Sequence, residues 1–196
     1  CLDTVLFIAF LDYSRTIKYN IILDWYYMIL MPRRLSAAAN IYKLLKLNDV
    51  KLSFVEDITG GELCSRLIKQ NIDVKNYIEQ SCVLLNSKVK SEFLNNVSIS
   101  QEDEISSNTV YNLAAEMISK STANIVIATI GSITQKDNIP SGLCYIAVGD
   151  KREIHVYKNM FKGNANEIID SVTMASYFYL IKKLKKNDFH FEKSTV

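Results

Sequence analysis

The chain has 196 residues, of which 48% are hydrophobic and 22% charged, with 23 Lys and Arg against 21 Asp and Glu. This length is typical of one domain, and the apolar content excludes an intrinsically disordered chain. The near balance of charge excludes a general attraction to nucleic acids or acidic membranes.

The first thirty residues differ in composition from the rest of the chain. Seven aromatic residues lie between Phe7 and Tyr27, and five charged residues interrupt the apolar run. No stretch of about 18 apolar residues is therefore available to span a bilayer, and the pattern of a signal peptide is absent. Because Met31 and Pro32 resemble a natural chain start, we expect residues 1–30 to be an appendage or an upstream extension and residues 31–196 to form the domain.

The pattern after residue 35 alternates between helix and strand. The expected helices begin near Ser36, Gly60, Asn86, Val110 and Gly163. The expected strands cover residues 50–55, 81–85, 124–130, 143–148 and 153–161. The apolar run at 124–130 is typical of a central strand, and the turn at 149–152 predicts a hairpin. This order predicts a three-layer α/β/α fold whose mixed sheet includes one antiparallel hairpin.

The turn at residues 56–61, E-D-I-T-G-G, is the segment richest in polar chemistry. It joins a predicted strand to a predicted helix, and Thr59 and Glu62 have the T-x-x-E spacing of a capping box. Two glycines and a helix N-terminus would place free N–H groups beside the carboxylates of Glu56 and Asp57. The pattern permits either an anion site with Thr59 as a hydroxyl contact or a plain capped turn.

Other sequence signals narrow the function further. Glycine-rich motifs for nucleoside triphosphates or dinucleotides are absent, and so is the G-x-S-x-G elbow of many hydrolases. Two histidines are too few for a His-rich zinc site, so we expect neither a metal nor a cofactor. The basic residues from Lys182 to Lys186 are typical of a solvated helix end, with an RNA-associated patch as the weaker alternative.

The order of segments resembles the CinA C-terminal-domain family over nearly all of residues 31–196. The family's motifs E-S-C-T-G-G, T-Y-S-N-E-A-K, T-G-I-A-G-P, P-V-G-T and F-x-G-D-R correspond to residues 56–61, 84–90, 129–134, 140–143 and 161–165. Active members are nicotinamide mononucleotide deamidases. The resemblance therefore implies an amidohydrolase that converts nicotinamide mononucleotide to nicotinic acid mononucleotide and ammonia, acting as a homo-oligomer on a pyridine nucleotide.

Departures from the family pattern fall on the reacting groups. The resemblance implies a serine nucleophile aided by a lysine, but the serine position holds Asp57 while the lysine is kept as Lys90. Ala165 stands at the position of an arginine that could clamp phosphate. An ion pair between Asp57 and Lys90 would keep the amine protonated and unable to act as a base. The alternatives are Thr59 or Ser87 as a substitute nucleophile, or a water activated by a carboxylate.

The sequence thus predicts a nicotinamide-nucleotide amidohydrolase with an eroded active site, the alternative being a non-catalytic nucleotide-binding or oligomeric scaffold. The candidate catalytic residues are Lys90, Thr59 and Asp57. The candidate substrate contacts are Glu56, Gly60, Gly61, Asn86, Ser87, Gly131, Gly142 and Gly163. We expect no nucleic-acid or membrane partner. Four widely spaced cysteines without a C-x-x-C pair predict buried thiols in a reducing, cytoplasmic location.

Overall fold

The computed structural model describes residues 37–100, 103–135 and 139–186. The appendage expected at residues 1–30 and its boundary at residue 31 lie outside the described residues. The helices are α3 (Ala37–Asn48), α4 (Glu62–Gln70), the short 3₁₀ helix η2 (Ile72–Tyr77), α5 (Ser87–Phe93), α6 (Ser107–Lys120) and α7 (Ala165–Lys186). The strands are β1 (Leu52–Glu56), β2 (Ile78–Val83), β3 (Ile125–Gly131), β4 (Leu143–Gly149) and β5 (Ile154–Met160).

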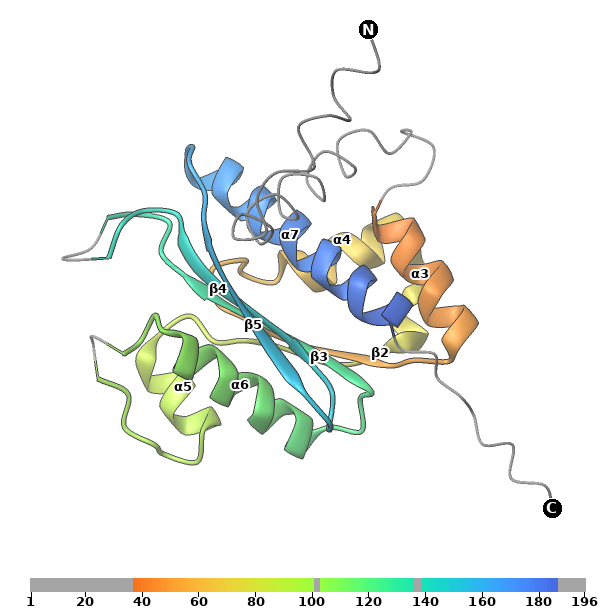
Figure 1. Ribbon diagram of the computed structural model, residues 1–196, viewed down its shortest axis with the longest axis horizontal. Helices are drawn as coiled ribbons and strands as arrows, with labels where there is room; N and C mark the ends of the chain where they lie inside the picture. The colour runs from red at the N-terminus through yellow and green to blue at the C-terminus, as the bar shows by residue number, and fades with distance from the viewer. Residues whose placement is uncertain (1–36, 101–102, 136–138, 187–196) are drawn as a thin grey trace, which may run out of the picture. The chain divides into compact units, whose positions relative to one another are not determined.

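The strands form one mixed sheet in the order β2-β1-β3-β4-β5. Strand β1 runs parallel to β2 and β3, whereas β4 pairs antiparallel with both β3 and β5. Helices α3, α4 and α7 cover one face of the sheet, and α5 and α6 cover the other (Figure 1). The predicted three-layer α/β/α architecture and the hairpin of the last two strands are confirmed.

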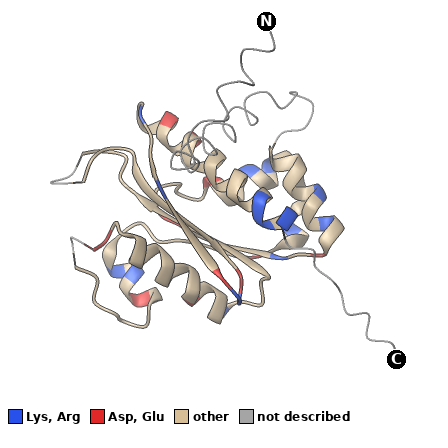
Figure 2. Cartoon of the chain, in the orientation of Figure 1, with Lys and Arg blue, Asp and Glu red and all other residues tan. Residues whose placement is uncertain are grey.

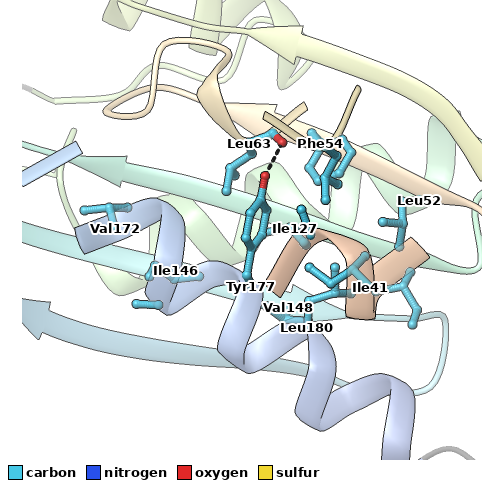
Figure 3. Close-up of a cluster of buried hydrophobic side chains, with 14 of the residues drawn as sticks. Ile41, Leu52, Phe54, Leu63, Ile127, Ile146, Val148, Val172, Tyr177 and Leu180 are labelled. Atoms are coloured by element: carbon cyan, nitrogen blue, oxygen red, sulfur yellow. Dashed lines mark hydrogen bonds between the residues drawn. The ribbon is translucent and has the colours of Figure 1, made fainter. Parts of the chain in front are cut away.

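The larger core lies between the sheet and the layer of α3, α4 and α7. Tyr177 of α7 is 1% exposed and extends between the layers, where its hydroxyl donates a hydrogen bond of 2.7 Å to the carbonyl of Leu63 (Figure 3). Burial raises the pKa of Tyr177, so the phenol stays neutral. Central strand β3 has six consecutive buried residues from Ile125 to Ile130, as its continuous apolar pattern predicted.

The parallel register brings three strand ends to one edge of the sheet. Glu56, the last residue of β1, is paired with Val83 of β2 and with Thr129 of β3. The turns that follow these strands therefore meet at the same edge, which is where ligands collect in open α/β sheets. This register positions the candidate site.

Three local expectations were wrong. Helix α4 begins at Glu62 rather than near Gly60. The Thr59–Glu62 capping box does not form, because the Thr59 hydroxyl donates to Glu56 and Glu62 pairs with Arg66 at 2.8 Å. The 3₁₀ helix η2 was not predicted, and β2 begins at Ile78, three residues earlier than expected. Both differences reflect packing of this segment against α4 and β1, which local periodicity does not report.

The basic end of α7 is only partly solvated. Figure 2 shows basic residues gathered on the C-terminal half of this helix. Lys183 is nevertheless 5% exposed and binds Asp150 at 3.1 Å and Glu153 at 3.0 Å. Burial raises the pKa of Asp150, but hydrogen bonds from the backbone of Arg152 and Glu153 and from Lys183 outweigh it and lower that pKa to about 2. This cluster anchors the end of α7 to the β4–β5 turn.

Three cysteines lie in the described part of the chain, and all are free thiols. Cys64 and Cys82 are half-buried and Cys144 is buried, and none of these three forms a disulfide. Burial raises the pKa of the Cys64 thiol and raises that of Cys144 to about 12, so both thiols are un-ionised at neutral pH.

Over the ranges that the structure describes, every helix is too short or too polar to cross a bilayer.

Candidate functional site

The turn between β1 and α4 is organised around one buried carboxylate. Glu56 is fully buried, and its Oε2 accepts hydrogen bonds from the Thr59 hydroxyl at 2.7 Å and from the N–H groups of Gly61 at 3.1 Å and Leu63 at 3.0 Å. Its Oε1 accepts from the N–H of Cys64 at 3.1 Å. Glu56 therefore caps α4 in place of the expected capping box, and the anion at this helix N-terminus belongs to the chain itself.

Thr59 is held inside this turn. The residue is only 3% exposed, and its hydroxyl oxygen lies 3.1 Å from that of Thr129. Since the single hydroxyl proton of Thr59 goes to Glu56, Thr129 is the donor in the second contact. Gly60 and Gly61 have φ angles of 57° and 96°, and a Cβ at Gly60 would meet no atom within 4 Å. The two glycines complete a left-handed turn whose outer side is open at Gly60.

Lys90 lies in a cage of two carboxylates. The residue is 1% exposed, although it stands on the short helix α5. Its Nζ is 3.1 Å from Oδ2 of Asp57 and 3.1 Å from Oε1 of Glu104. An ammonium group donates to both oxygens, and the cage carries one more negative charge than positive when both carboxyls are ionised.

The electrostatics of Asp57 follow from its burial. Desolvation raises the pKa of Asp57, and the nearby Lys90 amine and a hydrogen bond from the backbone of Gly131 only partly offset this. The Asp57 N–H also donates to the carbonyl of Thr129 at 3.1 Å. Asp57 thus joins β1, β3 and α5 at the site, and its carboxyl protonates at a higher pH than an exposed aspartate.

Lys90 lies in the first turn of helix α5. The Oδ1 of Asn86 accepts a hydrogen bond of 3.1 Å from the N–H of Val89 and so caps this helix, which begins at Ser87. The N–H of Lys90 donates to the carbonyl of Asn86 at 3.1 Å. Asn86 is exposed and Ser87 half-buried, so the two residues lie one turn from the caged amine at the surface of the site.

Three further candidate glycines make close contacts within the chain. A Cβ at Gly131 would lie 2.6 Å from the carbonyl oxygen of Leu143, and one at Gly142 would lie 1.9 Å from that of Phe161. Gly163 precedes α7, whose first turn is closed by reciprocal hydrogen bonds between Asn164 and Glu167. The structure thus brings eight of the candidate residues into one bonded network: Glu56, Asp57, Thr59, Gly60, Gly61, Asn86, Lys90 and Gly131. It shows no bond from Gly142 or Gly163 to that network among the described residues.

Glu104 and Thr129 belong to this network and were missed by sequence reasoning. Glu104 lies in the turn just before α6, ahead of the helix expected near Val110. Its only signal was the acidic run E-D-E at residues 102–104, which is ordinary for a surface loop. Thr129 stood in a recognised strand but was not singled out. Its hydroxyl reaches Thr59 because of the register between β1 and β3.

The arrangement favours ion pairing over metal binding. Across the described ranges, no group of three or more His, Cys, Asp or Glu residues is placed to hold a metal ion. Between Asp57 and Glu104, the Lys90 amine occupies the position that a cation would take. The same nitrogen could accept a proton only as a neutral amine, because an ammonium group has no lone pair.

Comparisons with known proteins agree on one family. The family model described as the CinA C-terminal domain matches residues 34–184. A CinA-like protein of Fusobacterium nucleatum is 31% identical over 158 residues, which is 74% of this chain and 37% of that protein. The chain spans about a third of the length of the curated relatives it matches.

Solved structures show the same fold at lower identity. A CinA superfamily protein from Klebsiella pneumoniae aligns with a TM-score of 0.70 and 18% identity, covering 77% of this chain and 97% of that one. A competence or damage-inducible protein from Enterobacter asburiae aligns with a TM-score of 0.68 and 20% identity, covering 76% and 96%. At these identities the likeness concerns the fold alone.

Proposed function

The chain belongs to the CinA C-terminal domain family, and from this premise we propose that it binds a pyridine nucleotide but does not hydrolyse it. The observation that carries this proposal is the caged amine of Lys90, 3.1 Å from both Asp57 and Glu104. The ligand class follows from the family resemblance, which implies nicotinamide mononucleotide. The loss of turnover follows from this chain's own residues.

Hydrolysis of an amide by a Ser–Lys pair needs a hydroxyl and an amine that can accept its proton. Asp57 replaces the hydroxyl with a carboxylate, which is a far weaker nucleophile toward an amide. Lys90, as an ammonium ion paired with Asp57 and Glu104, has no lone pair to offer. Both halves of the implied catalytic pair are therefore disabled, and Glu104 adds a constraint that substitution of Asp57 alone would not remove.

The substitute nucleophiles are also poorly placed. Removing the proton of Thr59 would create an alkoxide 2.7 Å from the Glu56 carboxylate, and the repulsion of two like charges opposes that step. In the described part of the chain, no base is hydrogen-bonded to the side chain of Ser87, the first residue of α5. Asp57 is the remaining base that could activate water, but its Oδ2 is paired with Lys90 at 3.1 Å, which opposes that role.

The binding part of the proposal uses the open side of the turn. Gly60 is exposed and has free space beside its Cα, while the N–H groups that begin α4 are already bonded to Glu56. We place the nicotinamide ring over Gly60 and Gly61, with Asn86 and Ser87 at the start of α5 beside it. Gly131, Gly142 and Gly163 stay candidate contacts, as do self-association and a cytoplasmic location.

Calorimetry and an ammonia assay test the two parts separately. We expect the purified full chain to bind nicotinamide mononucleotide saturably and to release no ammonia above the uncatalysed background. Sustained ammonia release would refute the loss of turnover. Absence of both binding and turnover would refute the nucleotide site and would favour the scaffold role. Gly60→Val serves as a binding control, because its branched side chain would occupy the open side and strain a φ of 57°.

A further inference from the structure

A cavity lies between β5 and the C-terminal half of α7. Its volume is about 240 Å³. The residues that line it are Val148, Glu153, His155, Tyr157, Tyr179, Lys182, Lys183 and Lys186. None of them belongs to the network of Glu56, Asp57 and Lys90, so this cavity is independent of the proposed nucleotide site.

Positive charge is in excess around this cavity. Its lining has three lysines and a single carboxylate, that of Glu153. Lys183 is committed to Asp150 and Glu153, whereas Lys186 is 68% exposed and reaches Glu153 only at 3.8 Å. Lys182 is exposed and forms no ion pair with any residue in the described part of the chain. Two ammonium groups are therefore available to a bound anion.

The other wall of the cavity is apolar and rigid. The rings of Tyr157 and Tyr179 are stacked, with centroids 3.7 Å apart and planes inclined by 3°. The hydroxyl of Tyr179 also donates to Oδ1 of Asn159 at 3.0 Å, which fixes the position of its ring. Val148 contributes a buried aliphatic surface. A wall of stacked rings beside two lysines is suited to a molecule that joins an aromatic ring to an anionic group.

We propose that this cavity binds a small aromatic phosphomonoester, with the phosphate between Lys182 and Lys186 and the ring against Val148 and Tyr157. The volume is below the roughly 300–1,000 Å³ of pockets that hold drug-sized ligands, so the ligand is small. A phosphate takes charge-assisted hydrogen bonds from two ammonium groups at once, which selects it over a neutral aromatic compound.

Titration calorimetry with three simple probes tests this site on the full chain. Phenyl phosphate carries both chemical features, inorganic phosphate only the anion, and phenol only the ring. We expect phenyl phosphate to bind saturably and more tightly than either of the other two. Lys182→Ala and Lys186→Ala should each weaken it about tenfold or more, because each removes one charge-assisted hydrogen bond.

Lys185→Ala is the matched control. Lys185 is exposed, lies in the same last turn of α7 and carries the same charge, but it does not line the cavity. Its substitution should change the affinity by less than about twofold, because Lys185 is exposed and outside the lining, and charge attraction through solvent is weak at physiological salt. The lysines that are substituted are all exposed, so none of these variants should impair folding.

Four results would overturn the proposal. Equal losses for Lys185→Ala and Lys182→Ala would indicate general attraction to a basic surface, as an RNA-associated patch would produce. If phenyl phosphate bound no more tightly than inorganic phosphate, the tyrosine rings and Val148 would contribute nothing to binding. Binding that is unchanged in both Lys182→Ala and Lys186→Ala would show that the ligand binds elsewhere. Absence of saturable binding would refute the proposal outright.

Discussion

Substitution of Lys90 by methionine should be among the most destabilising single changes in this chain. Methionine keeps most of the volume of the side chain but removes the ammonium group from between Asp57 and Glu104. Two unit charges 3.1 Å apart attract by about 5 kcal/mol at an effective dielectric constant of about 20, and burial of the amine offsets part of each contact. Removing one partner from a buried ion pair costs about 3–5 kcal/mol.

Urea unfolding followed by far-ultraviolet circular dichroism measures this loss. With a slope of about 2 kcal/mol per molar urea, a loss of about 4 kcal/mol lowers the midpoint by about 2 M. The cost should shrink toward acidic pH, because burial already raises the pKa of Asp57 and protonation removes the uncompensated charge. This dependence distinguishes lost ion pairing from lost packing, which does not vary with pH.

A triple variant provides the matched control. Lys90→Met combined with Asp57→Asn and Glu104→Gln leaves no unpaired charge, and it should recover most of the stability lost by Lys90→Met alone. A loss below about 1 kcal/mol for Lys90→Met at neutral pH would refute the reasoning. So would a triple variant that is no more stable than the single one.

Three further predictions concern the contacts of Glu56, Asp150 and Asp57. Glu56→Gln should destabilise the protein by about 2–3 kcal/mol in urea unfolding, because a neutral amide replaces a charged acceptor of four hydrogen bonds at the start of α4. Asp150, whose pKa is lowered from 3.8 to about 2, should contribute stability above pH 4 that is lost as the pH falls to 2. Allowing for solvent screening, that contribution is about 1–2 kcal/mol, and Asp150→Asn should abolish this part of the pH profile. In the ammonia assay, Asp57→Ser alone should stay inactive, whereas Asp57→Ser combined with Glu104→Gln should release ammonia from nicotinamide mononucleotide. Activity in the single variant would show that Glu104 does not restrain the Lys90 amine.

Most of the fold could be predicted from local patterns. The apolar run at residues 124–130 marked β3, because a strand covered on both faces tolerates few polar side chains. Asn86 was expected to begin a helix, and its side chain does accept the N–H of Val89. Such features depend on neighbours within four residues, so sequence spacing carries them.

The turn at residues 56–61 shows where local spacing misleads. Thr59 and Glu62 have the spacing of a capping box, yet Glu56 takes the N–H groups of Gly61, Leu63 and Cys64. Glu56 prevails because the end of β1 buries its carboxylate, and a buried charge must find donors. The spacing by itself allowed both arrangements, and burial selected one.

By itself, the sequence determined the order of helices and strands, the central position of β3 and the presence of polar groups after the parallel strands. It also singled out Asp57 and Lys90 as a pair of interest, through resemblance. Only the tertiary structure decided that Glu104 joins them and that Thr59 is bonded to Glu56. The physical reason is distance along the chain: Asp57 and Glu104 come from separate turns, and only the register of β1 and β3 with the packing of α5 and α6 brings them to one amine.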